Sequence, residues 1–175
     1  ALPISPGYTV SSNSGTLAKT GFTFAGWYTT ATGSGGTAYA ENQTGLTTDT
    51  NITLYAKWSA ASYAVTYSTD GGSTVPTQSD TAYGSIFTLP TAPTKAGFTF
   101  LGWQLNSNNY AAGSTFTMGS SAITFIAQWT GVYYAITYAL NGGSGLTPTQ
   151  ADVASGGSFT TASAPSRNGF IFNGW

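Results

Sequence analysis

One seven-residue motif recurs three times in this chain, and its spacing limits what the chain can form. The copies occupy residues 21–27, 97–103 and 169–175, so they begin 76 and then 72 residues apart. Each copy reads Gly-Phe, then Thr or Ile, then Phe, one variable residue and Gly-Trp. A fixed period of this kind marks a small structural unit copied in tandem. The spacing therefore predicts modules of roughly 70 residues.

The rest of the sequence keeps the same phase as the motif. Two further segments of seven residues, 52–58 and 123–129, both begin with Ile-Thr and end with Trp. We expect a complete second module at residues 63–129, with short linkers on either side. The first module, residues 1–58, is expected to lack its first strand. The third, residues 134–175, is expected to lack its last strands.

Apolar residues alternate with polar ones along most segments of the chain. Ile52, Leu54, Ala56 and Trp58 fall on one face of an extended segment, as a half-buried strand requires. The longest segments without Gly or Pro follow period two and not period 3.6, and one turn at residues 77–83 is the only helical candidate. The pattern therefore predicts a mostly β fold of tandem small modules with little or no helix.

Aromatic residues are the expected core material, because modules this small bury little surface and the aromatics make up 15% of the chain. An alternative reading of the Trp residues is a platform that stacks on sugar rings. The predicted core residues are Phe22, Phe24, Trp27, Trp58, Tyr63, Tyr67, Phe98, Phe100, Trp103, Trp129, Tyr134 and Tyr138. Three tyrosines outside this pattern, Tyr28, Tyr55 and Tyr110, are candidate contacts with a partner.

Composition excludes several function classes. Charged residues are only 5% of the chain and the net charge is −1, so there is no basic patch for nucleic acid or an anionic membrane. No run of 18 apolar residues exists to span a membrane. The chain has no His and no Cys, so the commonest catalytic base, thiol nucleophile and metal ligands are missing. We expect no enzyme activity, no metal and no cofactor, and an extracellular setting at the cell surface or in secreted form.

A cation stands two residues before each copy of the motif, although the chain contains only four cations. These residues are Lys19, Lys95 and Arg167, and acidic residues stand 17 before the motif at Asp80 and Asp152. Such recurrence indicates a defined role. A local ion pair is the first interpretation, and an intramolecular isopeptide crosslink is the alternative.

The sequence resembles the Listeria–Bacteroides repeat in four features. These are the motif, the Gly-rich loop after it, the Tyr-Ala pair and the closing Ile-Thr-Leu-Tyr-Ala-Lys-Trp segment. This module is also found as the B repeats of internalin-type surface proteins. The resemblance covers residues 8–58, 63–129 and the first part of a module at 134–175. It implies a β-grasp-like fold in tandem array on large secreted bacterial surface proteins. It brings no catalytic residues.

The expected function is that of a structural or adhesive tandem-repeat segment in a large extracellular bacterial surface protein or filament, where it acts as a spacer or stalk. The linkers, residues 59–62 and 130–133, are short enough to restrict bending. Expected partners are neighbouring modules, or further copies of the chain that complete an open sheet edge by strand addition. The alternative is a carbohydrate- or receptor-binding module that uses the off-core aromatics to contact a glycan or host protein.

Overall fold

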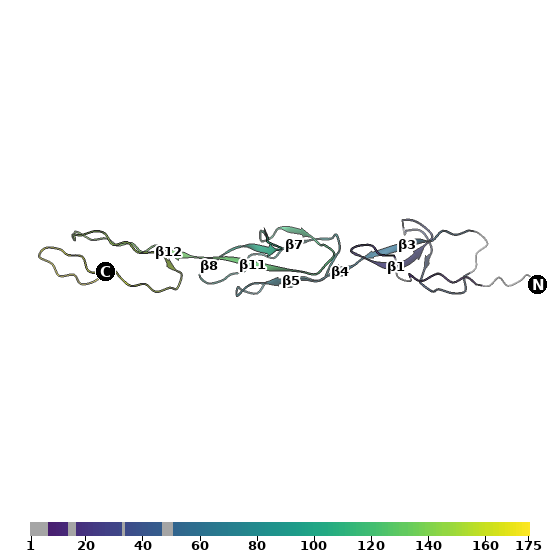
Figure 1. Ribbon diagram of the computed structural model, residues 1–175, viewed down its shortest axis with the longest axis horizontal. Helices are drawn as coiled ribbons and strands as arrows, with labels where there is room; N and C mark the ends of the chain where they lie inside the picture. The colour runs from purple at the N-terminus through teal and green to yellow at the C-terminus, as the bar shows by residue number, and fades with distance from the viewer. Residues whose placement is uncertain (1–6, 14–16, 33, 47–50) are drawn as a thin grey trace, which may run out of the picture. The chain divides into compact units, whose positions relative to one another are not determined.

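The computed structural model describes residues 7–13, 17–32, 34–46 and 51–175, and the described residues form strands and turns without a helix (Figure 1). The prediction of a mostly β fold is confirmed. The turn of helix at residues 77–83 is wrong, because Thr81 and Ala82 belong to a strand. The β-grasp-like arrangement stays a prediction.

The strands are short and fall into several small sheets. In chain order they are β1 (Phe22–Tyr28), β2 (Ala38–Tyr39), β3 (Tyr55–Ala60), β4 (Ser62–Tyr63), β5 (Val65–Ser68), β6 (Thr81–Ala82), β7 (Ile86–Thr88), β8 (Phe98–Leu105), β9 (Asn108–Tyr110), β10 (Thr115–Thr117), β11 (Ile123–Gly131), β12 (Tyr133–Tyr134) and β13 (Val153–Ala154).

The chain divides into two compact units, and the first contains residues 1–66, 78–88 and 115–123. Its three-stranded sheet has the order β2-β1-β3, and two-stranded sheets pair β10 with β7 and β4 with β6. The buried apolar side chains of this unit are Val10, Val65, Phe87 and Met118. The motif supplies β1, whose Phe and Trp residues face the sheet partners β3 and β2.

The second unit contains residues 67–77, 89–114 and 124–175. The middle copy of the motif supplies β8 in a four-stranded sheet of order β5-β11-β8-β9. Trp103 and Phe125 are completely buried in this sheet. At the start of β5 and β11, Ile123 N donates to Ala64 O, and further along the rings of Tyr67 and Phe125 stack. The two strands therefore run in the same direction.

The second glycine of the motif forms a β-bulge in both sheets. The register shifts between Phe24 and Gly26 in β1, and at the equivalent position opposite Gly102 in β8. Both glycines have positive φ, 110° and 144°, which side chains of L-residues rarely adopt. A Cβ on Gly102 would also lie 2.8 Å from Tyr110 O. The bulge aims the following Trp at the sheet interior.

Two predicted core residues are exposed. Phe98 is 45% exposed, because it is the first residue of β8. Its ring contacts the Lys95 ammonium, which lies 4.8 Å from the ring centroid. Tyr134 is 58% exposed, because its strand β12 pairs only with the two residues of β13. Alternation assigns a side chain to a face of a strand, but it does not say whether another layer covers that face.

Candidate functional site

Aromatic clusters organise each copy of the motif. Phe24 meets both Trp27 and Trp58 edge to face, with ring centroids 5.2 and 5.7 Å apart. Phe100 makes the same two contacts with Trp103 and Trp129, at 5.3 and 5.5 Å. Edge-to-face pairs of this geometry stabilise beyond the area that they bury. These rings therefore serve the packing of their own module.

The motif Trp also closes a hydrogen bond in all three copies. The indole Nε1 of Trp27 donates to Ser11 O at 3.0 Å, that of Trp103 to Pro90 O at 3.1 Å, and that of Trp175 to Ala162 O at 2.8 Å. The completely buried indole of Trp103 needs such an acceptor. The bond ties the motif to the segment that precedes it.

A tyrosine packs on the motif Trp in the second and third copies, with one difference. Tyr138 lies 4.5 Å from the Trp175 ring, and its hydroxyl accepts a hydrogen bond from Ala162 N at 2.9 Å. Tyr67 lies 5.2 Å from Trp103, but Pro90 takes the place of Ala162 and has no N–H to donate. The buried Tyr67 hydroxyl is left without a partner, and burial raises its pKa above the ordinary value.

The recurring cation lies over an aromatic ring in every copy. Lys19 Nζ is 4.1 Å from the centroid of Phe22, and the Arg167 guanidinium carbon is 4.2 Å from that of Phe170. Lys95 lies over Phe98, and it pairs with the Asp70 carboxylate at 3.7 Å instead of Asp80. The shared role is therefore a cation–π contact, to which the second module adds an ion pair.

Two of the three candidate partner tyrosines lie side by side. Tyr28 and Tyr55 are directly opposite in the β1–β3 pair, and the Lys57 ammonium lies 4.0 Å from the Tyr28 ring centroid. Tyr110 is half-buried in β9, where its ring meets Phe125 edge to face at 5.8 Å. The structure thus pairs exposed Tyr55 with half-buried Tyr28 and places the third ring against the core of the second unit.

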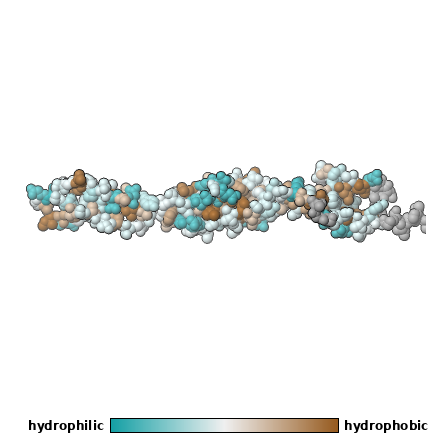
Figure 2. All heavy atoms as spheres, viewed as in Figure 1, coloured by the Kyte–Doolittle hydropathy of each residue, from teal (hydrophilic) through white to brown (hydrophobic). Residues whose placement is uncertain are grey.

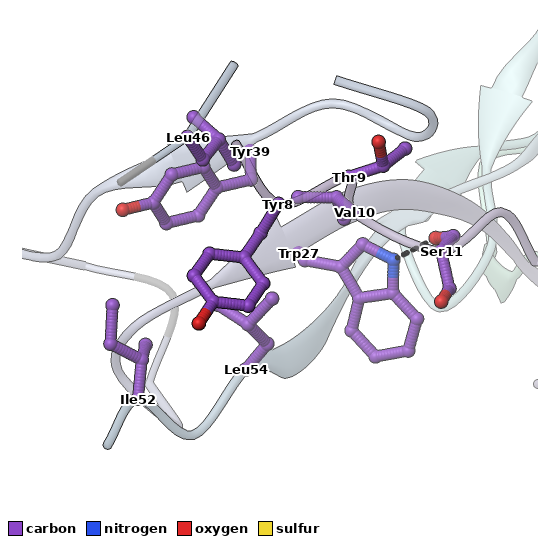
Figure 3. A pocket seen from close by; sticks show the side chains of 9 residues that line it. All are labelled: Tyr8, Thr9, Val10, Ser11, Trp27, Tyr39, Leu46, Ile52 and Leu54. Atoms are coloured by element: carbon purple, nitrogen blue, oxygen red, sulfur yellow. Dashed lines mark hydrogen bonds between the residues drawn. The ribbon is translucent and has the colours of Figure 1, made fainter. Parts of the chain in front are cut away.

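A pocket of about 370 Å³ opens in the first unit beside Trp27 (Figure 3). Its lining is mostly apolar and consists of Tyr8, Thr9, Val10, Ser11, Trp27, Tyr39, Leu46, Ile52 and Leu54. In the second unit the Tyr67 ring packs on Trp103 and Phe125, which correspond in the repeat to Trp27 and Leu54. Two residues of the pocket lining, Trp27 and Leu54, therefore correspond to the residues that contact the Tyr67 ring in the second unit.

The first linker is held by main-chain hydrogen bonds on both sides. Ala61 N donates to Gly21 O at 2.9 Å, and Ala61 O accepts from Tyr83 N at 2.8 Å. The Tyr83 ring covers Gly21 so closely that a Cβ there would overlap it, and it meets Phe22 edge to face at 5.4 Å. We name this arrangement of Gly21, Ala61 and Tyr83 the first joint. It connects the first and second modules.

An equivalent joint recurs at the second linker. Val132 N donates to Gly97 O at 2.9 Å, and Val132 O accepts from Ser155 N at 2.8 Å. A Cβ on Gly97 would lie 3.2 Å from Ser155 Cβ. We name Gly97, Val132 and Ser155 the second joint. Sequence reasoning identified the linkers but missed both joints, and the signal that marks them is the Gly that opens every copy of the motif.

Nothing in the described residues assembles a metal centre. No group of three or more acidic, His or Cys side chains gathers within residues 7–13, 17–32, 34–46 and 51–175. The same residues contain no helix with the length and apolarity needed to cross a membrane. Figure 2 shows a mostly pale face, as expected when charged residues are 5% of the chain.

Small repeated β modules, each closed by aromatic rings and tied to the next at a short linker, define a tandem-repeat protein. The family of this repeat follows from comparison with known proteins: the Listeria-Bacteroides repeat domain matches residues 3–57, 63–128 and 134–175, and the chain belongs to that family. The predicted resemblance is confirmed.

Similar proteins come from bacteria, and two of them are named as membrane proteins. A Gly-rich membrane protein of Evansella cellulosilytica is 34% identical over 91% of this chain and 18% of its own length. A second membrane protein of that organism is 36% identical over 71% of the chain and 18% of its length. Internalin H of Listeria monocytogenes is 39% identical over 64% of the chain and 20% of its length. The chain thus spans about a fifth of these relatives, and no solved structure matches it significantly.

Proposed function

We propose that this chain is a structural repeat segment of a large bacterial cell-surface protein, in which it acts as a spacer or stalk. The observation that carries the proposal is the recurrence of the joint. Ala61 and Val132 each use both the main-chain N–H and the C=O to bridge adjacent modules. A linker residue fixed on both sides cannot act as a free swivel.

The placement at the cell surface rests on the family and on the names of the relatives. The scarcity of charge fits a spacing role better than electrostatic capture of a ligand, because steering a partner requires a concentrated field of one sign.

Spin-label distance measurements test the spacer function directly, because the chain has no native Cys to interfere with labelling. Labels at Thr23→Cys and Ile86→Cys lie on strands on either side of the first joint. We expect a narrow distance distribution. Ala61→Pro removes the N–H that donates to Gly21 O and should broaden the distribution, while Ala61→Ser keeps it narrow.

The same comparison applies at the second joint. Val132→Pro removes a donor, and the near-isosteric Val132→Thr retains it. Retained far-UV circular dichroism shows that the modules stay folded in each variant. A wild-type distribution as broad as that of Ala61→Pro would refute the spacer proposal.

A second candidate function is glycan or receptor binding, and the pairing of Tyr28 with Tyr55 favours it. Tyr55 is 42% exposed, so the pair presents aromatic surface next to the Lys57 ammonium. Binding on a glycan array that disappears with Tyr55→Ala, but persists with Tyr110→Ala, would support this function. An array without any bound glycan would leave the spacer function as the better explanation.

A further inference from the structure

The two joints form the same main-chain hydrogen bonds, but they differ in one side chain. Strands β6 and β13 occupy equivalent places, because each pairs with the short strand, β4 or β12, that begins its module. The residue after β6 is Tyr83, and the residue after β13 is Ser155. The first joint therefore has a tyrosine ring where the second has only a hydroxymethyl group.

The main-chain bonds of a joint all end on one linker residue. In the first joint Ala61 supplies both the donor and the acceptor, and in the second joint Val132 does the same. These bonds fix the linker, but they connect the two modules at a single place. A further contact at some distance from that residue resists bending more strongly, because it acts over a longer lever arm.

The Tyr83 ring makes such a contact in the first joint. It belongs to the second module and lies directly over Gly21 of the first module, where a Cβ would overlap Tyr83 Cγ. Gly21 is buried, and the ring also meets Phe22 edge to face at 5.4 Å. The Lys19 ammonium lies 4.1 Å from the centroid of the Phe22 ring. These side chains pack in sequence from one module to the next without passing through the linker.

The corresponding contact in the second joint is much smaller. A Cβ on Gly97 would lie 3.2 Å from Ser155 Cβ, and Ser155 has no ring that could meet Phe98. A tyrosine does occur nearby, but the Tyr133 ring lies over its own linker, where a Cβ on Gly131 would be 3.1 Å from Tyr133 Cε2. That contact joins residues two positions apart, so it does not bridge the modules.

We propose that the residue at the position of Tyr83 sets the stiffness of each joint. Tyrosine at this position holds two adjacent modules at a fixed angle, because its ring packs on the preceding module. Serine at the same position leaves a hinge. The inference rests on the proposed spacer function and adds to it the place where the spacer bends, which is the joint at Val132 and not the joint at Ala61.

Matched pairs of spin labels measure the two joints separately in the full chain. Thr23→Cys with Ile86→Cys spans the first joint, and the counterpart pair, Thr99→Cys with Ser158→Cys, spans the second. We expect a narrower distance distribution for the first pair than for the second. Val132→Pro should broaden the second distribution further, because it removes a main-chain bond that the hinge retains.

A reciprocal exchange of side chains tests the cause of this difference. Tyr83→Ser should widen the first distribution to about the width of the second, and Ser155→Tyr should narrow the second. Tyr83→Phe keeps the ring and serves as the matched control, so it should leave the first distribution unchanged. The Ala61 N–H should exchange about tenfold faster in Tyr83→Ser, the scale of one lost aromatic contact.

The possible outcomes separate this inference from the spacer function. Far-UV circular dichroism checks that the modules stay folded in each variant. Two distributions as broad as that of Ala61→Pro would refute the spacer function itself. The inference alone is overturned if the two distributions are equally narrow, if either exchange leaves the width unchanged, or if Tyr83→Phe acts like Tyr83→Ser.

Discussion

Alanine at the first glycine of the motif separates backbone strain from contact at the joint. Gly21, Gly97 and Gly169 have nearly the same φ, 78°, 77° and 77°. Alanine at each position should lower the free energy of unfolding by a similar amount, about 1–2 kcal/mol, because an L-residue is strained in a left-handed conformation. The surroundings differ. A Cβ at 21 overlaps the Tyr83 ring, one at 97 lies 3.2 Å from Ser155 Cβ, and one at 169 meets nothing within 4 Å among the described residues.

The expected cost is therefore graded. Gly169→Ala carries the strain alone, and Gly97→Ala adds a few tenths of a kcal/mol, because Ser155 has to shift slightly. Gly21→Ala adds about 2 kcal/mol, the scale of forced overpacking, because the overlap reaches Tyr83 Cγ, which a rotation of the ring cannot move away.

Amide hydrogen exchange is the suitable assay, because a melting temperature is poorly defined for several modules in one chain. The reporters are the joint donors, Ala61 N–H and Tyr83 N–H. The local reporter for Gly169→Ala is Phe170 N–H, which donates to Arg167 O. Relative to the unsubstituted chain, the joint amides in Gly21→Ala should be accelerated about thirtyfold more than Phe170 N–H is in Gly169→Ala, as an added 2 kcal/mol implies.

A second variant tests the cause. Tyr83→Ala removes the overlapping ring, so in the Gly21→Ala background it should bring the cost of Gly21→Ala down to that of Gly169→Ala. Equal acceleration of the local reporter amides in Gly21→Ala and Gly169→Ala, or no coupling between residues 21 and 83, would refute the close packing of the first joint.

Further outcomes concern single side chains. Tyr67→Phe should leave stability in urea unchanged or raise it, because it removes a buried hydroxyl without a partner, whereas Tyr138→Phe should cost about 1 kcal/mol. The raised pKa of Tyr67 means that the folded chain holds this proton more tightly than the unfolded chain. The contribution of Tyr67 to the free energy of unfolding is therefore fully present below the ordinary pKa of 10.0 and is lost as the pH rises above it. Tyr67→Phe should reduce this loss of stability in melts at alkaline pH. Asp70→Asn should change stability by less than about 1 kcal/mol at any salt concentration, because the carboxylate is exposed. Gly72→Ala should destabilise by about 1–3 kcal/mol in urea and shift the Trp129 emission, because the added Cβ lies 2.6 Å from that ring.

The period of the repeat and the alternation within it predicted most of the strands. The predicted strand 123–129 appears within β11, and 52–58 appears shifted toward its end, as β3 at Tyr55–Ala60. Alternation alone is not sufficient: residues 8–10 form only a bridge between Tyr8 and Leu46, and of the alternating residues 134–138 only Tyr134 lies in a ladder. Alternation identifies residues able to form a strand, but a ladder also requires a paired neighbour.

The joints and the role of the cations were beyond sequence reasoning for a different reason. In the first joint, one hydrogen bond links Gly21 to Ala61, 40 positions apart, and the other links Ala61 to Tyr83, 22 positions apart. Both bonds use main-chain atoms, which leave no signature in the pattern of side chains. The recurrence of Lys19, Lys95 and Arg167 was visible, but their partner was not. The aromatic ring three residues later competes with a distant carboxylate, and the nearby ring costs less chain entropy to reach.

The joint has a consequence for how such a chain changes its length in evolution. Its hydrogen bonds use only main-chain groups. The second joint therefore forms the same two bonds with Val132 at the position of Ala61 and Ser155 at the position of Tyr83. A module duplicated by recombination can form these hydrogen bonds with its new neighbour immediately, because no pair of side chains has to change first. Gain or loss of whole copies is then tolerated at the level of structure, and selection can set the reach of the protein by counting repeats.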